Sequence, residues 1–290
     1  MANLKEVRAR IQSVNSTQQI TKAMKMVAAA KLRKAQESIT KMRPFSKKLS
    51  GLLQNLSSAS ADLDFDNPFM TVREPNHILL VVVTSDRGLC GGFNTNITKA
   101  VTHLYHQTYA GKEVSLLCIG KKGYEFLSKR MPRVNGDFHL LFSKLSYANV
   151  QEAAQFIMDG FARQEYDKVV LVYNEFKNVA TQIVREEDFL PFTAVDTSGS
   201  GNQTNYIYEP DQLTILSELI PKALHMQLYK AVLDSNASEQ GARMTAMDKA
   251  TENAGELLKE LKLMYNRTRQ ASITTEILEI VGGAEALVAN

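Results

Sequence analysis

The chain has 290 residues, of which 44% are hydrophobic and 22% are charged, and its formal net charge is +3. This length suffices for one large or two modest domains, but the longest wholly apolar run, residues 78–83, is far shorter than the roughly 20 residues of a membrane-spanning helix. Cys90 and Cys118 are too few for a disulfide framework and lack metal-ligand spacing. The N-terminus has no apolar secretion core, so we expect a cytosolic protein.

The modest net charge conceals a strongly basic N-terminal segment. Residues 1–48 hold twelve Lys and Arg side chains against Glu6 and Glu37, a balance of +10. Such a segment is most often a solvated helix face, but it could also bind nucleic acid, an anionic membrane or an acidic protein surface. Charge alone leaves these alternatives open.

The first predicted element is a long helix over residues 3–57, in which Pro44 is the only proline and Gly51 the only glycine. Apolar residues follow three- and four-residue spacing from Leu4 onward, which predicts one strand of a coiled coil with a stutter. An interior proline removes a helical hydrogen bond, so Pro44 predicts a kink.

The middle of the chain alternates strands with helices, which predicts a Rossmann-like three-layer α/β domain with a mostly parallel sheet over residues 76–196. The predicted strands are 77–84, 114–119, 138–142 and 168–173, with an edge strand at 180–189. The predicted helices are 94–110, 123–130 and 147–163. A polar loop, residues 197–209, follows.

The last predicted element is a helix over about residues 211–288, with Pro221 near its start. We expect it to pair with the first helix as an antiparallel coiled coil of residues 1–58 and 210–290, because neither apolar stripe can be buried alone. At about 1.5 Å per residue the two helices span ~80 and ~115 Å, so the C-terminal end should extend beyond its partner. That end is apolar on more than one face, which predicts insertion into a partner; its residues are Ile273, Ile277, Leu278, Ile280, Val281 and Leu287.

No stretch carries a recognisable catalytic, cofactor or metal site. Residues 84–94 follow a strand and precede a helix, but they match neither the P-loop nor the dinucleotide fingerprint, so we interpret them as a structural turn. Among the five histidines only His103 and His106 are spaced for one helix face, and no third ligand accompanies them. We therefore predict no catalytic residue, no cofactor and no metal.

Five segments in chain order resemble the gamma subunits of bacterial ATP synthases. They are residues 20–36 (ITKAMKMVAAAKLRKAQ), 84–94 (TSDRGLCGGFN), 206–210 (YIYEP), 239–247 (EQGARMTAM) and 265–284 (YNRTRQASITTEILEIVGGA). The last is the most specific, since it holds the pattern Ile-Thr-x-Glu-x-x-Glu-x-x-x-Gly-Ala. The loop after Thr197 has no cysteine, so the thiol switch of plant relatives is not implied.

The resemblance implies a non-catalytic rotor shaft, in single copy, that couples proton flow to ATP synthesis or hydrolysis at the cytoplasmic face of a bacterial membrane. Its implied partners are the alpha and beta subunits of the catalytic ring, the epsilon subunit and the c-ring. Contacts to the ring are implied for Lys22, Met24, Lys25, Arg243, Arg269, Gln270, Thr274 and Glu276. Contacts at the foot of the shaft are implied for Tyr206 and Glu209.

Two other classes of protein are compatible with parts of the pattern. A basic coiled coil joined to an α/β domain could bind nucleic acid, with affinity that falls steeply as salt rises; Phe45 is the only aromatic residue before residue 60, which argues against base stacking. The α/β segment could instead be a nucleotide-dependent enzyme domain, which predicts a ligand-induced rise in melting temperature. The missing phosphate fingerprint argues against that reading.

Overall fold

The computed structural model describes residues 4–59, 67–179, 181–192, 209 and 211–288. Packing divides the chain into two compact units. The first, here called the helical unit, consists of Met1–Val27 and Met244–Asn290; the second, called the α/β unit, is Ala28–Arg243. The long helices α1 (Leu4–Ala59) and α5 (Gln212–Val288) contribute to both units.

In the helical unit, α1 and α5 run antiparallel, as predicted. The pairing is visible in two contacts whose order reverses between the helices: Gln18 donates to the carbonyl of Thr251 at 3.4 Å, and Lys25 meets Asp248. The Thr251 hydroxyl also donates to that of Thr21 at 2.8 Å, so the seam contains a polar layer. These contacts fix which turn of one helix faces which turn of the other.

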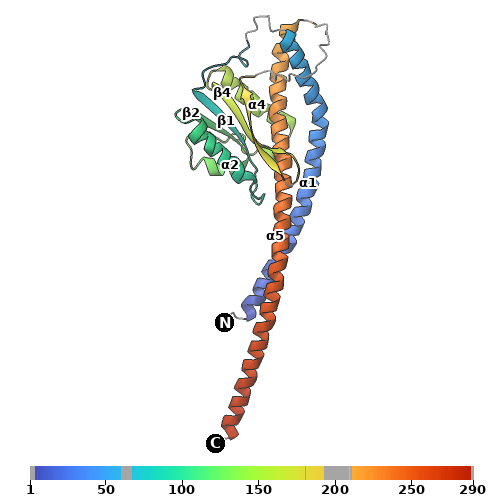
Figure 1. The fold of residues 1–290 in the computed structure, drawn as a ribbon, viewed down its shortest axis with the longest axis vertical. Helices are drawn as coiled ribbons and strands as arrows, with labels where there is room; N and C mark the ends of the chain where they lie inside the picture. The colour runs from blue at the N-terminus through green and yellow to red at the C-terminus, as the bar shows by residue number, and fades with distance from the viewer. Residues whose placement is uncertain (1–3, 60–66, 180, 193–208, 210, 289–290) are drawn as a thin grey trace. The chain divides into compact units, whose positions relative to one another are not determined.

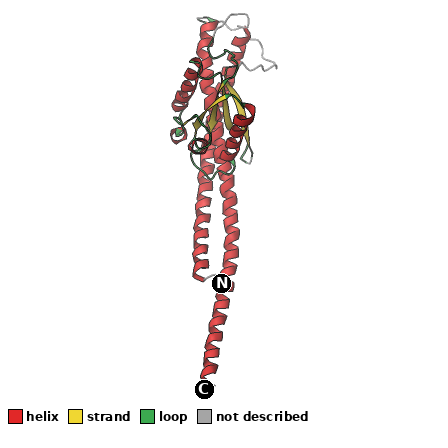
Figure 2. Cartoon of the chain, turned by 90° about the vertical axis from the view of Figure 1, so that its left-hand side faces the viewer, coloured by secondary structure: helices red, strands yellow, loops and turns green. Residues whose placement is uncertain are grey.

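The seam buries only some of the residues that the apolar periodicity selects, since Leu257 and Met264 are 43% and 46% exposed. Val7 of α1 and three residues of α5 are each at most 9% exposed: Ala254, Leu258 and Leu261. Beyond Thr268 every side chain of α5 that the structure describes is exposed, because no part of α1 lies beside it. Figures 1 and 2 show α5 continuing alone past the N-terminal end of α1.

The α/β unit is built on a five-stranded sheet in the order β3-β2-β1-β4-β5. Its strands are β1 (His77–Val83), β2 (Glu113–Ile119), β3 (Val134–Asn135), β4 (Lys168–Phe176) and β5 (Gln182–Leu190). All neighbours are parallel except β5, which is antiparallel to β4 at the edge. The predicted mostly parallel α/β fold with two long terminal helices is therefore confirmed.

Helices cover both faces of this sheet, since β1 is buried on both sides from Ile78 onward. α2 (Phe93–His103), extended by a π-helical turn Leu104–Thr108, and α3 (Lys121–Leu127) border one face; α4 (Tyr147–Ala162) covers the other (Figure 1). The cluster under α2 joins alternate residues of β1 to one helix stripe: Ile78, Leu80, Val82, Phe93, Ile97 and Val101.

The predicted strand at residues 138–142 is wrong. The third parallel strand is instead the two-residue β3, which pairs with Leu116 and Leu117. A turn then begins, because the Asn135 side chain accepts a hydrogen bond from the Asp137 backbone at 2.8 Å, and the apolar run that follows enters a 3-10 helix, Leu141–Lys144. A run of five residues is too short for its periodicity to distinguish a strand from a turn followed by a 3-10 helix.

Within the α/β unit, α5 is buried on nearly all sides between Leu224 and Arg243. The sheet domain contacts it directly: Gln227 donates to the Glu187 carboxylate at 2.8 Å, and Tyr229 packs edge-to-face on Tyr147 with ring centroids 5.3 Å apart. This stretch of α5 also carries buried polar side chains, which are His225, Asp234, Ser235, Ser238, Glu239, Gln240 and Arg243. α1 continues through Pro44 without a break in the helix.

Candidate functional site

The α1 segment expected to contact a partner lies in the helical unit and is only partly occupied by contacts within the chain. Lys25 forms an ion pair with Asp248 at 2.5 Å, with side chains 40% and 59% exposed. Met24 is half-buried and Lys22 is exposed. An ion pair this accessible contributes little stability, so both the pair and Lys22 remain available to a partner.

Three apolar neighbours on the same segment were not singled out from the sequence. Ile20, Met26 and Val27 are 59%, 61% and 56% exposed. They fall outside the three- and four-residue seam, which is the signal that could have identified them. Exposed apolar side chains gathered beside a basic face are typical of a protein-binding surface.

The predicted polar contact residues of the C-terminal segment lie along the part of α5 that has no partner helix. Arg269, Gln270, Thr274 and Glu276 are all exposed. Among the described residues, the side-chain bonds of these four are local to the helix: the Thr274 hydroxyl donates to the Gln270 carbonyl at 2.9 Å, and Glu276 accepts from Ser272 at 3.5 Å. The structure places these residues within two turns of one another and leaves their side chains free for other contacts.

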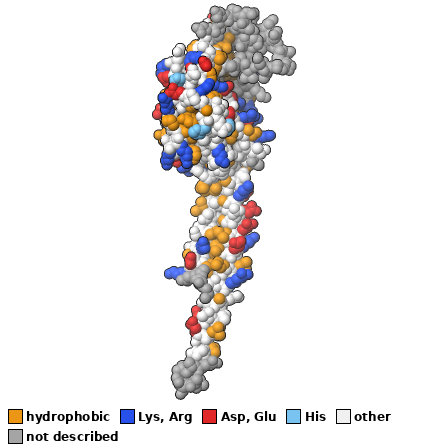
Figure 3. All heavy atoms as spheres, turned by 60° about the vertical axis from the view of Figure 1, so that its left-hand side comes forward, with side chains coloured by type: hydrophobic (Ala, Val, Ile, Leu, Met, Phe, Trp, Pro, Cys, Tyr) orange, Lys and Arg blue, Asp and Glu red, His pale blue; other side chains and the backbone are white. Residues whose placement is uncertain are grey.

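The predicted apolar tip is exposed to solvent throughout its described part. The exposed fractions are 47% for Ile273, 54% for Ile277, 65% for Leu278, 71% for Ile280 and 49% for Val281. The side chain of Leu287 is outside those that the structure describes. Figure 3 shows apolar side chains at the surface along this end of α5. An exposed run of large aliphatic side chains is typical of a surface that binds a partner.

Arg243 is placed differently from the other predicted contacts, because it is buried within the α/β unit. Its guanidinium donates to the carbonyls of Gly88 and Arg87, the latter at 3.0 Å, and to the carboxylate of Glu239 at 2.7 Å. Burial raises the pKa of the Glu239 carboxyl, and the hydrogen bond from Arg243 opposes that rise. Arg243 therefore anchors the turn after β1 to α5.

That turn, residues 84–94, is held by bonds within the chain. The Thr84 hydroxyl accepts the Gly123 backbone N–H at 2.9 Å, and the Asn94 side chain accepts that of Ser85 at 3.0 Å. Gly120 sits beside Thr84 with a positive φ of 107°, and an added Cβ there would overlap the Thr84 carbonyl. The turn is thus held by its own side chains and by the backbone of α3, which supports the interpretation of a structural turn.

The two cysteines and the metal-ligand side chains of the described residues are further groups that could carry chemistry. Burial raises the pKa of Cys90 and raises that of Cys118 to about 12, so neither thiol ionises at neutral pH. Among the described residues, no three His, Cys, Asp or Glu side chains are grouped to hold a metal ion. Of the two predicted foot residues, Glu209 is exposed, whereas Tyr206 lies outside the described residues. Across the described segments, no helix has the length and apolar character that a bilayer crossing requires.

Comparison with protein families gives a match over nearly the whole chain. A family model described as ATP synthase matches residues 3–287. A curated relative, the ATP synthase gamma chain of Cytophaga hutchinsonii, is 55% identical over 99% of each chain.

Two solved structures with a similar fold are chains of mitochondrial ATP synthases. A chain of the Tetrahymena thermophila mitochondrial ATP synthase central stalk and c-ring is 28% identical, with a TM-score of 0.60 over 80% of this chain and 99% of that one. A chain of the Euglena gracilis mitochondrial ATP synthase, in a structure of OSCP, F1 and c-ring, has a TM-score of 0.69 over 99% and 95% of the two chains. At 22% identity the second likeness concerns the fold alone.

Proposed function

Because the chain belongs to the gamma-chain family of ATP synthase, we propose that it is the rotating shaft that couples proton flow through a membrane rotor to ATP synthesis or hydrolysis. The gamma chain is a central-stalk subunit and not the catalytic subunit of that complex. The proposed partners are the alpha and beta subunits of a catalytic ring, the epsilon subunit and the c-ring. One copy would serve each complex, held peripherally at the cytoplasmic face of a bacterial membrane.

The observation that carries this proposal is the unpaired apolar end of α5. Beyond Thr268 the helix exposes at least five large aliphatic side chains, from Ile273 to Val281. Each buried aliphatic side chain is worth about 1.5–3 kcal/mol relative to an exposed one, so a sleeve formed by partner subunits would stabilise this end strongly. A shaft tip seated in a ring meets that requirement.

The proposed mechanism is differential contact. Two unlike helices that end at different points have no threefold symmetry, so their surface cannot contact three equivalent ring subunits in the same way. A subunit that binds one face of the shaft better in one conformation is shifted toward that conformation. Rotation then changes which subunit receives which face.

We assign the coupling contacts to both parts of the helical unit. On α1 they are Lys22, Met24 and Lys25; on α5 they are Arg269, Gln270, Thr274 and Glu276. Arg243, whose guanidinium is occupied within the chain, would act on the ring by positioning the turn at residues 84–94. Tyr206 and Glu209 would face the c-ring and the epsilon subunit.

We further propose a functional division of the chain into three parts. Residues 1–58 and 210–290 would form the shaft that carries torque. Residues 76–196 would form the inserted globular domain, and residues 197–209 the loop at the foot. This division is made by the proposed role of each part, whereas the helical unit and the α/β unit described above are defined by packing.

Arg269→Ala combined with Gln270→Ala tests the assignment. In a reconstituted complex the double variant should lower ATP turnover by roughly tenfold, if the pair contributes about 1.4 kcal/mol to the rate-limiting state. Both residues are exposed, so the thermal midpoint of the isolated chain should not change. Gln107→Ala with Lys112→Ala, also exposed but in the α/β unit, is the matched control. Unchanged turnover in the test variant would remove this pair from the coupling surface.

A further inference from the structure

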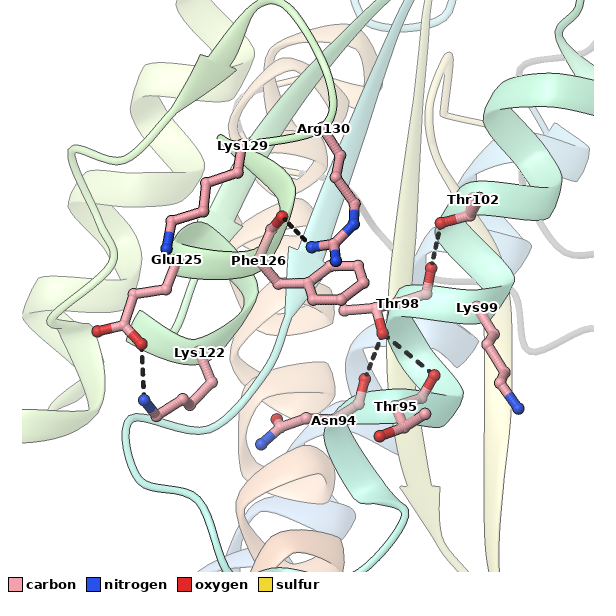
Figure 4. A pocket seen from close by; sticks show the side chains of 10 residues that line it. All are labelled: Asn94, Thr95, Thr98, Lys99, Thr102, Lys122, Glu125, Phe126, Lys129 and Arg130. Carbon is pink, nitrogen blue, oxygen red and sulfur yellow. Dashed lines mark hydrogen bonds and ion pairs between the residues drawn. The ribbon is translucent and has the colours of Figure 1, made fainter.

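A cleft of about 670 Å³ opens on the α/β unit between α2 and α3. α2 contributes Thr95, Thr98 and Lys99 to its wall, and α3 with the turn after it contributes Lys122, Phe126 and Arg130. Figure 4 shows the aromatic ring of Phe126 between the two walls, with the charged side chains on either side of it. The cleft is separate from the coupling contacts assigned above, none of which lines it.

The cleft carries an excess of positive charge. Its lining contains the cations Lys99, Lys122, Lys129 and Arg130 and a single carboxylate, Glu125. Glu125 is already paired with Lys122 at 2.6 Å and lies 3.8 Å from Lys121 outside the cleft. Among the described residues no carboxylate is close enough to Lys99, Lys129 or Arg130 for an ion pair, although Lys129 still interacts electrostatically with Glu125.

The middle of the cleft is suited to a protein contact. The Arg130 guanidinium lies 3.7 Å from the centre of the Phe126 ring, and its Nη1 also donates to the Phe126 carbonyl at 3.2 Å. The stacking holds Arg130 in one orientation while Phe126 remains 37% exposed. An exposed aromatic ring and an ordered arginine, surrounded by lysines, are typical of the centre and rim of a protein interface.

We propose that the α2–α3 cleft docks an acidic segment of a partner protein. In Figure 4, Lys99 points away on one side and Lys129 on the other. Cations spread along a cleft in this way suit carboxylates distributed along a peptide better than a compact phosphate, which needs donors that converge on one point. Phe126 and the stem of Arg130 would receive an apolar side chain of the same segment.

A fluorescent reporter in the cleft tests the proposal on the full-length chain. Thr95 is exposed and lines the cleft, and both native cysteines are buried, so Thr95→Cys can be labelled selectively with an environment-sensitive dye. The probe is a short polyglutamate peptide with one central leucine. It should change the dye signal saturably, with an affinity that falls as salt rises. A reporter at this position also separates binding in the cleft from binding to the basic segment of α1.

Two charge-removing variants in the reporter background decide the outcome. Lys99→Gln with Lys129→Gln should weaken the peptide by about tenfold, whereas Lys112→Gln with Lys144→Gln, exposed lysines outside the cleft, should change its affinity by less than about twofold. Equal binding of a peptide with glutamine in place of glutamate would overturn the proposal. So would equal weakening by both variants, or a signal produced by inorganic triphosphate or anionic lipid vesicles but not by the peptide.

Discussion

At the scale of single residues, Asp234 of α5 is a buried carboxyl group whose ionised form is disfavoured. It is 8% exposed, and burial raises its pKa to about 6. Charged groups surround it on four elements: Lys230 on α5 and Arg43 on α1 favour its ionised form, while Glu175 on β4 and Glu187 on β5 disfavour it. The net effect is that folding favours the protonated carboxyl.

Asp234→Asn is therefore expected to stabilise the α/β unit at high pH and to lose that advantage as pH falls. The folded pKa lies above the unfolded value of 3.8, so the folded chain binds the extra proton and its stability falls as pH rises from about 4 to 6. At pH 8 ionised Asp234 costs roughly 3 kcal/mol. Urea unfolding of both proteins at pH 8 and pH 5 should show the advantage of the variant shrink by at least about 1 kcal/mol. A pH-independent difference would contradict the assignment.

At the scale of elements, the β2–α3 junction depends on one glycine. Gly120 has φ +107°, and a Cβ there would overlap the carbonyl of Thr84. Gly111, before β2, also has a positive φ, +80°, but has open space around the corresponding position. A comparison of the two positions therefore distinguishes the cost of backbone strain alone, at Gly111, from the cost of strain together with steric overlap, at Gly120.

Gly120→Ala should destabilise the chain by about 3 kcal/mol or more, whereas Gly111→Ala should cost only about 1–2 kcal/mol, the strain of a left-handed alanine. Urea denaturation of the two variants beside the parent measures the difference. If both cost the same, the close approach of Gly120 to Thr84 does not constrain the junction.

Elements with a sustained pattern could be predicted from the sequence. Helix α1, the buried strands β1, β2 and β4, and α4 all lie close to their predicted positions, because each repeats its apolar period over enough residues to exclude the alternative. β3 could not be predicted, since two residues carry no period. The Arg243 anchor was also missed, because its acceptors are backbone carbonyls 155 and 156 positions away along the chain, and backbone atoms leave no mark in a sequence.

The candidate site, like the fold, could be predicted from the sequence only in part. Exposure of the apolar tip followed from apolar residues on more than one helix face, and the structure agrees from Ile273 to Val281. By contrast, the exposed Ile20, Met26 and Val27 were missed although they fall outside the seam spacing, because spacing alone does not show which apolar residues stay exposed. Which of two adjacent apolar residues enters a seam depends on the facing helix and not on local sequence.

At the scale of the whole molecule, the apolar end of α5 should matter to the assembly and not to the isolated chain. Ile277 and Ile280 are 54% and 71% exposed, so Ile277→Ser with Ile280→Ser should change the stability of the free chain by only about 0.5 kcal/mol. In the complex the same variant should weaken assembly, since two buried aliphatic side chains are worth several kcal/mol, about 3 or more. Thermal melts and subunit co-purification measure the two effects. A variant that assembles normally would show that this end is not enclosed.

The polar layer in the seam of the helical unit affects how well the two helices resist sliding along each other when torque is applied. The Thr21 and Thr251 hydroxyls are bonded at 2.8 Å, and Gln18 reaches the Thr251 carbonyl. If one helix slid lengthwise past the other by one turn, the bond between the two hydroxyls and the bond from Gln18 to the Thr251 carbonyl would both be lost. A purely aliphatic seam tolerates such a lengthwise shift of one helix better. Torsion applied to one helix should therefore reach the other with little lost to slippage.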